Sequence, residues 1–256
     1  MGTWRTALLM ALAMGVLGAA RAYPTLTGPT GLIALPGGEV SESGLLFAAD
    51  ALDQPAGRAL PLRAQFVFAP GFEFGALYNP FNDDAAPDYA VGANAKLVIG
   101  LPDGPRVGFG AQFLRLRYPA GDERDYWQGY VAWTTDFNPE LYDASNLSLT
   151  VGATWTQAKE ADARMEALRG FIGARVRMTE RIVLVAEYQT KDADLGDAEA
   201  LSSLGVRLAL GDAFAVQAGV TNAHGLLAGD VHHFFLGASM LLTNSDDRDY
   251  PDISRW

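Results

Sequence analysis

The stretch YAVGANAKLVI at residues 89–99 decides the class of fold, because its side chains alternate between apolar types and small or polar types. The apolar positions are Val91, Ala93, Ala95, Leu97 and Ile99, and the positions between them include Gly92, Asn94 and Lys96. A second stretch, LSLTVGATWTQ at residues 147–157, repeats this design. A period of two residues is typical of a β-strand whose two faces meet different surroundings. Both stretches are therefore predicted to be strands with one apolar and one polar face.

The same alternation recurs along the chain in about twelve segments, and helical periodicity is nearly absent. The segments lie near residues 44–52, 60–69, 72–79, 88–100, 105–118, 125–136, 147–157, 169–178, 181–190, 201–210, 213–221 and 232–243. About 9–11 tilted residues cross a bilayer as a strand, whereas strands of soluble domains are mostly about five or six residues long. Because several segments reach the longer length, the sequence predicts an all-β fold: an antiparallel up-and-down transmembrane β-barrel of about twelve strands.

The predicted connections are short at one end of the barrel and long at the other, as in outer-membrane barrels. Tight turns are expected at Pro70-Gly71, Thr179-Glu180 and Gly211-Asp212, and longer loops at residues 79–87, 120–124, 158–168, 191–200 and 222–231. The ten-residue connection at 137–146 is an exception on the short-turn side. A soluble sandwich or lipocalin-like barrel would also alternate, with its apolar face inside. Strand length and loop asymmetry favour the membrane barrel.

Glycine is frequent on the polar, inward-facing side of these segments, where a small residue permits curvature and leaves room. The positions are 92, 108, 110, 152, 173, 205, 219 and 237.

The two ends of the chain differ from the barrel segment. Residues 1–22 have a positive Arg5, an apolar stretch too short to span a bilayer and the small-residue pattern Ala20-Arg21-Ala22, so they are predicted to be a cleaved signal peptide. We expect residues 23–43 to form a periplasmic N-terminal segment, residues 44–243 the outer-membrane barrel, and residues 244–256 an acidic periplasmic tail. The predicted location is the outer membrane of a Gram-negative bacterium.

Charge and cysteine content exclude several classes of function. The net charge is −11, and loss of the two arginines of residues 1–22 would bring it to about −13, which makes nucleic-acid binding a poor expectation. The chain has no cysteine, so disulfides, thiolate metal sites and a lipid-anchored N-terminal cysteine are excluded.

An N-terminal motif precedes the first predicted strand. The stretch GPTGLIALP at residues 28–36 resembles the N-terminal signature of the YjbH-like outer-membrane proteins. The resemblance implies an outer-membrane barrel linked to exopolysaccharide production or export, although members of that family are longer and often lipoproteins. We expect a structural role for the motif, with the segment packed into the periplasmic mouth; its residues are Gly28, Thr30, Gly31, Leu32, Ile33 and Pro36.

Catalytic and metal-binding residues are not recognisable. The three histidines, His224, His232 and His233, lie in or beside the last predicted loop and in no nucleophile motif, and the acidic pairs lie in loops or the tail. Adjacent histidines on a strand would point to opposite faces, which makes a poor chelate. We therefore expect no enzyme activity, no cofactor and no metal.

Four basic residues are predicted to face the lumen in its periplasmic half and to form a basic cluster: Lys96, Arg175, Arg177 and Arg207. Such a cluster in an acidic protein could attract an anionic solute or polysaccharide. The alternative is that inward-facing Glu73 and Glu187, helped by Glu39 or Glu42, neutralise the cluster across the barrel. Charged networks of that kind hold small barrels together.

Arg115 and Arg117 continue the outward face of their predicted strand near the long loops. On the outer wall at that level they could pair with lipopolysaccharide phosphates. A β-bulge would reverse the phase and turn both inward. The pattern allows either arrangement.

The predicted function is a non-enzymatic role in the outer membrane, by resemblance in exopolysaccharide production or export. The alternative is a narrow passive channel for small anionic solutes. The expected partners are outer-membrane lipid and lipopolysaccharide, with polysaccharide or export-system proteins following from the resemblance.

Overall fold

The structure is a computed structural model that describes residues 24–27, 29, 31–38, 44–54, 57–69, 71–80, 87–100, 105–118, 122–137, 146–160, 163–179, 181–195, 197–211, 213–224 and 226–242. The strands are β1 (Gly44–Gln54), β2 (Gly57–Ala59), β3 (Leu62–Ala69), β4 (Phe72–Pro80), β5 (Tyr89–Gly100), β6 (Arg106–Arg117), β7 (Glu123–Phe137), β8 (Asn146–Glu160), β9 (Ala163–Arg177), β10 (Ile182–Gln189), β11 (Leu201–Ala209), β12 (Phe214–His224) and β13 (Leu227–Leu242). The predicted signal peptide and acidic tail lie outside the described residues.

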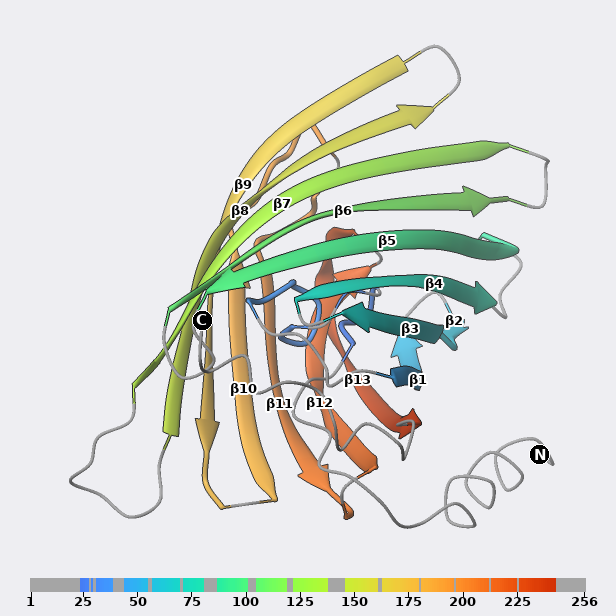
Figure 1. Cartoon of the computed structure of the whole chain (residues 1–256). Helices are drawn as coiled ribbons and strands as arrows, with labels where there is room; N and C mark the ends of the chain where they lie inside the picture. Colours follow the sequence, from blue (N-terminus) through green and yellow to red (C-terminus); the bar gives the residue numbers. More distant parts are fainter. Residues whose placement is uncertain are drawn as a thin grey trace, which may run out of the picture.

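The strands close into a barrel (Figure 1). Each strand from β3 to β13 pairs antiparallel with its neighbour along the chain, and β1 pairs with both β3 and β13. The short β2 pairs only with β1 among the described strands, so twelve strands form the ring. Closure leaves no strand edge unpaired, which a hydrocarbon environment requires. The all-β, antiparallel up-and-down barrel predicted from the alternation is confirmed.

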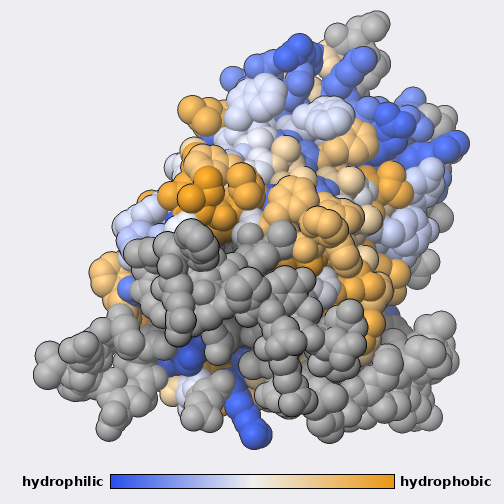
Figure 2. All heavy atoms as spheres, viewed as in Figure 1, coloured by the Kyte–Doolittle hydropathy of each residue, from blue (hydrophilic) through white to orange (hydrophobic). Residues whose placement is uncertain are grey.

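The outer wall carries the apolar face of each strand. Exposed large side chains include Phe74, Leu97, Phe109, Trp133, Ile172, Leu204 and Leu236. Figure 2 shows an apolar band across the visible face and hydrophilic residues at the end where β6 and β8 finish and β7 and β9 begin. Phe113 and Trp127 stack on neighbouring strands, with ring centroids 4.7 Å apart, at an end of the apolar band where interfacial aromatics are expected. No helix in the described part of the chain is long and apolar enough to cross a membrane.

Two of the predicted long loops are tight hairpins instead. β8 ends at Glu160 and β9 begins at Ala163, so the expected loop at 158–168 is mostly strand. β12 and β13 likewise leave only two residues between His224 and Leu227, where a loop at 222–231 was expected. The prediction was wrong because a polar composition does not by itself end a strand. Here the backbone pairing continues through polar residues, and β7, β8 and β9 reach 15 residues each.

The described residues of 24–38, which we call the plug segment, lie inside the barrel. In Figure 1 this segment, in dark blue, occupies the space enclosed by the strands. It contributes no strand to the ring of described strands, and a backbone bridge joins Gly31 to Pro36. Leu32, Ile33 and Leu35 are buried among side chains of the surrounding wall. The barrel interior is therefore filled at this level by the chain's own N-terminal part.

Candidate functional site: the barrel lumen

The plug segment is held by a buried carboxylate of the wall. Glu187 on β10 accepts hydrogen bonds from three successive backbone N–H groups, those of Ile33 (3.0 Å), Ala34 (2.8 Å) and Leu35 (3.1 Å). Three consecutive N–H groups that converge on one point form an anion-binding concavity. Hydrogen bonds to an ionised acceptor are the stronger kind, so Glu187 is the central contact of the plug segment.

Two arginines and a threonine bind other parts of the plug segment. Arg207 on β11 donates to the carbonyl oxygens of Gly31, at 3.1 Å, and of Leu32. Arg63 on β3 donates to the carbonyls of residues 24 and 25 and pairs with Asp50 on β1. The N–H of Gly38 donates to Thr134 Oγ1 at 2.9 Å. Donors and acceptors from four sides thus satisfy the buried backbone of the plug segment, as a chain without regular structure requires.

Inner-face glycines make the space into which the plug segment fits. A Cβ atom at Gly173 would lie 2.0 Å from Leu32 Cδ1, and one at Gly205 would lie 3.1 Å from Ile33 Cδ1. Of the N-terminal motif, Gly31, Leu32, Ile33 and Pro36 belong to the buried plug segment, whereas positions 28 and 30 lie outside the described residues. Leu32 and Ile33 are 0% and 1% exposed, so they pack as core residues.

The structure brings three of the four predicted basic-cluster residues together. Arg177 and Arg207 lie in one transverse row, separated by Val183 of β10, and Arg175 is two residues along β9. Lys96 lies on β5, four strands away, where its Nζ is 3.6 Å from Glu73 Oε1. Arg207 is engaged by the plug segment, while Arg175 and Arg177 lie at the turn end of the wall. Glu73 and Glu187 both face inward, as neutralisation of the basic cluster would require. Glu73 pairs with Lys96, whereas Glu187 binds backbone N–H groups of the plug segment.

Basic side chains outnumber acidic ones on the lumen side. Among the inward-facing residues whose side chains the structure describes, eight are basic and five acidic: Arg63, Lys96, Arg106, Arg124, Arg169, Arg175, Arg177 and Arg207 against Asp50, Glu73, Asp136, Glu187 and Asp197. The chain as a whole has a net charge of −11. The described part of the interior therefore has a positive excess, whereas the chain as a whole is acidic.

A buried ion pair fixes the loop end of the lumen. Arg169 on β9 and Asp197 in the connection between β10 and β11 are joined through both carboxylate oxygens, at 3.0 and 2.9 Å, and each side chain is 1% exposed. Asp197 also accepts from the N–H of Ala228, and Arg169 donates to the carbonyl of Leu226, each at 3.0 Å. The pair therefore ties the β10–β11 connection and the β12–β13 hairpin to the inner wall. The sequence does not predict this contact, because the polar stretch around Asp197 has the composition of an exposed loop.

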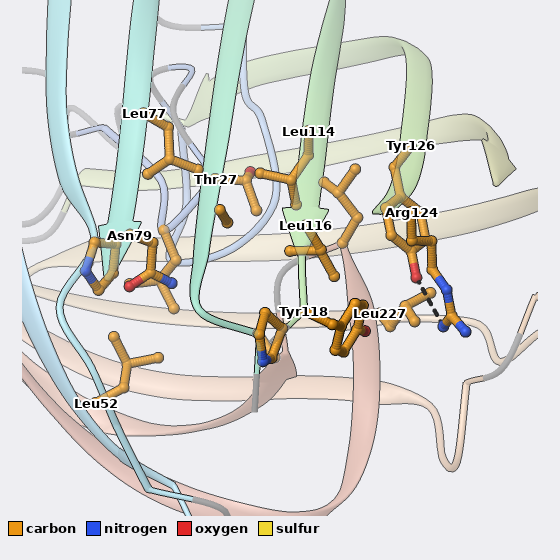
Figure 3. A pocket seen from close by; sticks show the side chains of 16 residues that line it. Thr27, Leu52, Leu77, Asn79, Leu114, Leu116, Tyr118, Arg124, Tyr126 and Leu227 are labelled. Atoms are coloured by element: carbon orange, nitrogen blue, oxygen red, sulfur yellow. Dashed lines mark hydrogen bonds between the residues drawn. The ribbon is translucent and has the colours of Figure 1, made fainter. Parts of the chain in front are cut away.

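An apolar cavity of about 250 Å³, the loop-side cavity, lies between the plug segment and the loop end (Figure 3). Its lining is mostly leucine, proline, alanine and tyrosine, with three polar side chains: Leu26, Thr27, Leu52, Pro61, Leu77, Asn79, Pro87, Ala90, Leu114, Leu116, Tyr118, Arg124, Tyr126, Ala223, Leu226 and Leu227. In Figure 3 the labelled side chains of β4, β6 and β7 point into one common space. The sequence predicts small or polar side chains on the inner face. At this level of the barrel the inner face is mainly apolar instead.

Arg115 and Arg117 lie on the outer wall, and the register between β5, β6 and β7 runs without a bulge. Arg115 forms a two-pronged contact with Asp125, at 2.7 and 2.8 Å, and a second ion pair with Glu123 at 3.3 Å. Arg117 donates to Tyr89 Oη at 3.3 Å. Outward alternation was thus the correct one of the two arrangements. A contact with lipopolysaccharide stays a prediction.

The histidines lie on strands rather than in a loop, because the β12–β13 connection is a tight hairpin. His232 is exposed and His233 buried, on opposite faces of β13. His232 Nε2 is 2.8 Å from Ser202 Oγ on the outer wall. Within the described residues no carboxylate or amide hydrogen-bonds to His232, so the third member of a hydrolytic triad is absent there. That part of the chain also has no group of three potential metal ligands.

Solved structures with the same fold include outer-membrane porins. The KdgM porin in complex with disordered oligogalacturonate aligns over 78% of this chain and 99% of its own, with a TM-score of 0.55 and 10% identity. The NanC porin aligns over 77% and 100% (TM-score 0.53, 11% identity), and the Acinetobacter baumannii outer membrane protein Omp33 over 78% and 99% (TM-score 0.50, 8% identity). No family model and no curated protein matches the sequence.

These comparisons correct the family resemblance drawn from the N-terminal motif. The neighbours are small porins, and nothing among them points to the YjbH-like proteins or to exopolysaccharide. The motif gave a wrong family assignment because it is short and because packing inside the barrel accounts for its residue types. Leu32 and Ile33 fill the lumen, and Gly31 makes a close backbone approach to residues 35–37. Any barrel with such a plug segment would favour these residue types.

Proposed function

We propose that this protein is a non-enzymatic outer-membrane barrel of Gram-negative bacteria that forms a narrow passive channel for small anionic solutes. The observation that carries the proposal is the charge of the lumen, where basic side chains outnumber acidic ones in a protein of net charge −11. A lumen of one sign within low-dielectric walls concentrates solutes of the opposite sign. In the structure the plug segment occupies the lumen, so transport requires its displacement.

The porin fold supports this proposal, since it places a closed wall around a lumen of suitable size. The solved KdgM porin holds oligogalacturonate, whose sugar units carry carboxylates. Arg175 and Arg177 would be among the first basic residues that a solute meets at the turn end of the wall, because both lie near the end of β9.

The proposal is tested by ion conductance of the reconstituted full chain in a planar bilayer. With a potassium chloride gradient, we expect discrete current steps whose reversal potential shows a preference for chloride. Replacing both Arg175 and Arg177 by glutamate should shift that potential towards potassium, since the lumen would lose its positive excess. Arg181→Glu, on the exposed β9–β10 turn, is the matched control and should leave selectivity unchanged.

An absence of current steps in both the full chain and a chain without the plug segment would refute the channel. Equal selectivity in the wild type and the double variant would refute the role of these two arginines.

A further inference from the structure

We infer that the loop-side cavity is a binding site for a small, uncharged apolar molecule, about the size of one aromatic ring with a short substituent. This inference goes beyond the proposed channel and does not depend on it. It rests on the position of the lining residues, the volume of the cavity and the state of its polar groups.

On the side formed by β4 to β7, the interior changes from polar to apolar along the barrel axis. On β4, Glu73 near the turn end gives way to Leu77, and on β6, Gln112 gives way to Leu114. All four of these lumen-facing side chains are buried. A passage for hydrated solutes gains nothing from leucine at such positions, whereas ligand pockets are lined mainly by apolar and aromatic side chains.

The walls of the cavity hold it open. Leu77, Ala90, Leu114 and Tyr126 project from four adjacent strands, β4 to β7, whose backbones are fixed by continuous inter-strand pairing. Protein interiors are otherwise packed densely, and lining atoms beside a void lose dispersion contacts. An apolar cavity of about 150 Å³ already stays dry and binds benzene. At about 250 Å³, this one has room for a ring with a substituent.

The polar groups at the margin of the cavity are engaged within the protein. Arg124 Nη1 donates to Tyr126 Oη at 3.3 Å, as the dashed line in Figure 3 marks. Asn79 Oδ1 accepts from the N–H of Leu60 at 3.0 Å, and Thr27 Oγ1 lies 3.2 Å from the hydroxyl of Thr25. One polar atom of each of these three side chains therefore has a protein partner, and the rest of the lining is mainly apolar or aromatic. This favours an uncharged apolar molecule over the anions proposed for the channel.

The test uses iodobenzene soaked into crystals of the full chain, because the anomalous scattering of iodine locates the bound molecule. We expect one strong peak enclosed by Leu77, Leu114 and Tyr126. Ala90→Phe places a ring in the cavity from the β5 wall and should remove the peak. Ala93→Phe, which projects outward from the same strand, is the matched control and should retain it.

A solution measurement keeps the inference testable if Ala90→Phe fails to fold. Fluorobenzene binding to protein in lipid nanodiscs, followed by fluorine NMR, should be saturable for the wild type. Leu116→Gln, which makes the lining polar, should abolish the saturable part while preserving the heat-dependent gel shift of a folded barrel.

Iodine density confined to the outer wall, or unchanged binding in both cavity variants, would overturn the inference. Neither result bears on the channel, because conductance and ion selectivity are measured without the apolar probe.

Discussion

Deleting residues 24–38 should convert a mostly closed barrel into one that conducts continuously. The plug segment is buried in the lumen and is held by Glu187, Arg207 and Arg63, so its removal leaves the passage lined by wall side chains alone. The refolded deletion variant and the full chain are compared in planar bilayers at equal protein concentration. We expect a large increase in mean current from the variant.

Point substitutions separate loss of the plug segment from damage to the barrel. Glu187→Ala removes three hydrogen bonds to a carboxylate, and a net cost of about 3 kcal/mol would shift the balance between docked and released segment by roughly 100-fold. Gly173→Val acts differently, since its side chain would occupy the place of Leu32. Both should raise the time spent open. Glu199→Ala, on an exposed loop residue, should not. If the deletion variant is as silent as the full chain, the plug segment does not close the lumen.

Replacing Asp197 by alanine should cause the largest loss of stability among single loop substitutions. The change leaves the Arg169 guanidinium buried without its carboxylate, and breaking a buried pair from one side costs about 3–5 kcal/mol. It also removes the acceptor for the N–H of Ala228. Urea unfolding in micelles, followed by tryptophan fluorescence, should show a lower midpoint. Trypsin should cut more readily after Lys191, because the β10–β11 connection loses its link to the wall.

Asp194→Ala is the matched control for this prediction, because Asp194 is an exposed carboxylate in the same connection. A second variant, with Arg169→Met and Asp197→Leu together, removes both charges and should recover part of the lost stability. Equal urea midpoints for Asp197→Ala and the wild type would contradict the assigned role of the ion pair.

The sequence could predict the barrel because its wall obeys a local rule. Alternation in stretches such as residues 89–99 separates an apolar from a polar face, and the register repeats this strand by strand. Strand length and loop asymmetry then assign the apolar face to hydrocarbon. The same rule allowed an outward position for Arg115 but left open a bulge that would turn it inward, and the structure shows the outward one. The ends of the strands could not be predicted, because polar residues near Glu160 and Ala163 fit a strand beyond the bilayer as well as a loop.

The interior depends on long-range contacts that no local pattern contains. From the sequence, Glu187 cannot be distinguished from any other inward-facing carboxylate. The closed barrel shows that three backbone N–H groups of the plug segment converge on it. Gly173 and Gly205 were correctly placed on the inner face, but the side chains that use their space come from the far end of the chain. The apolar lining near Leu114 could have been noticed from leucines that interrupt the polar face of their strand.

The position of the plug segment sets an order of events in folding. Ile33 and Glu187 are 154 residues apart, and Gly31 and Arg207 are 176 apart, so these contacts have very high sequence separation. Contacts of that kind form late, because they depend on strands that must already be in place. A cysteine introduced at Ala34 would be the only one in the chain, and during refolding its protection from maleimide should lag behind the gel shift that marks closure. A segment that leaves the ribosome before every strand of the ring would then be the last to reach its native position.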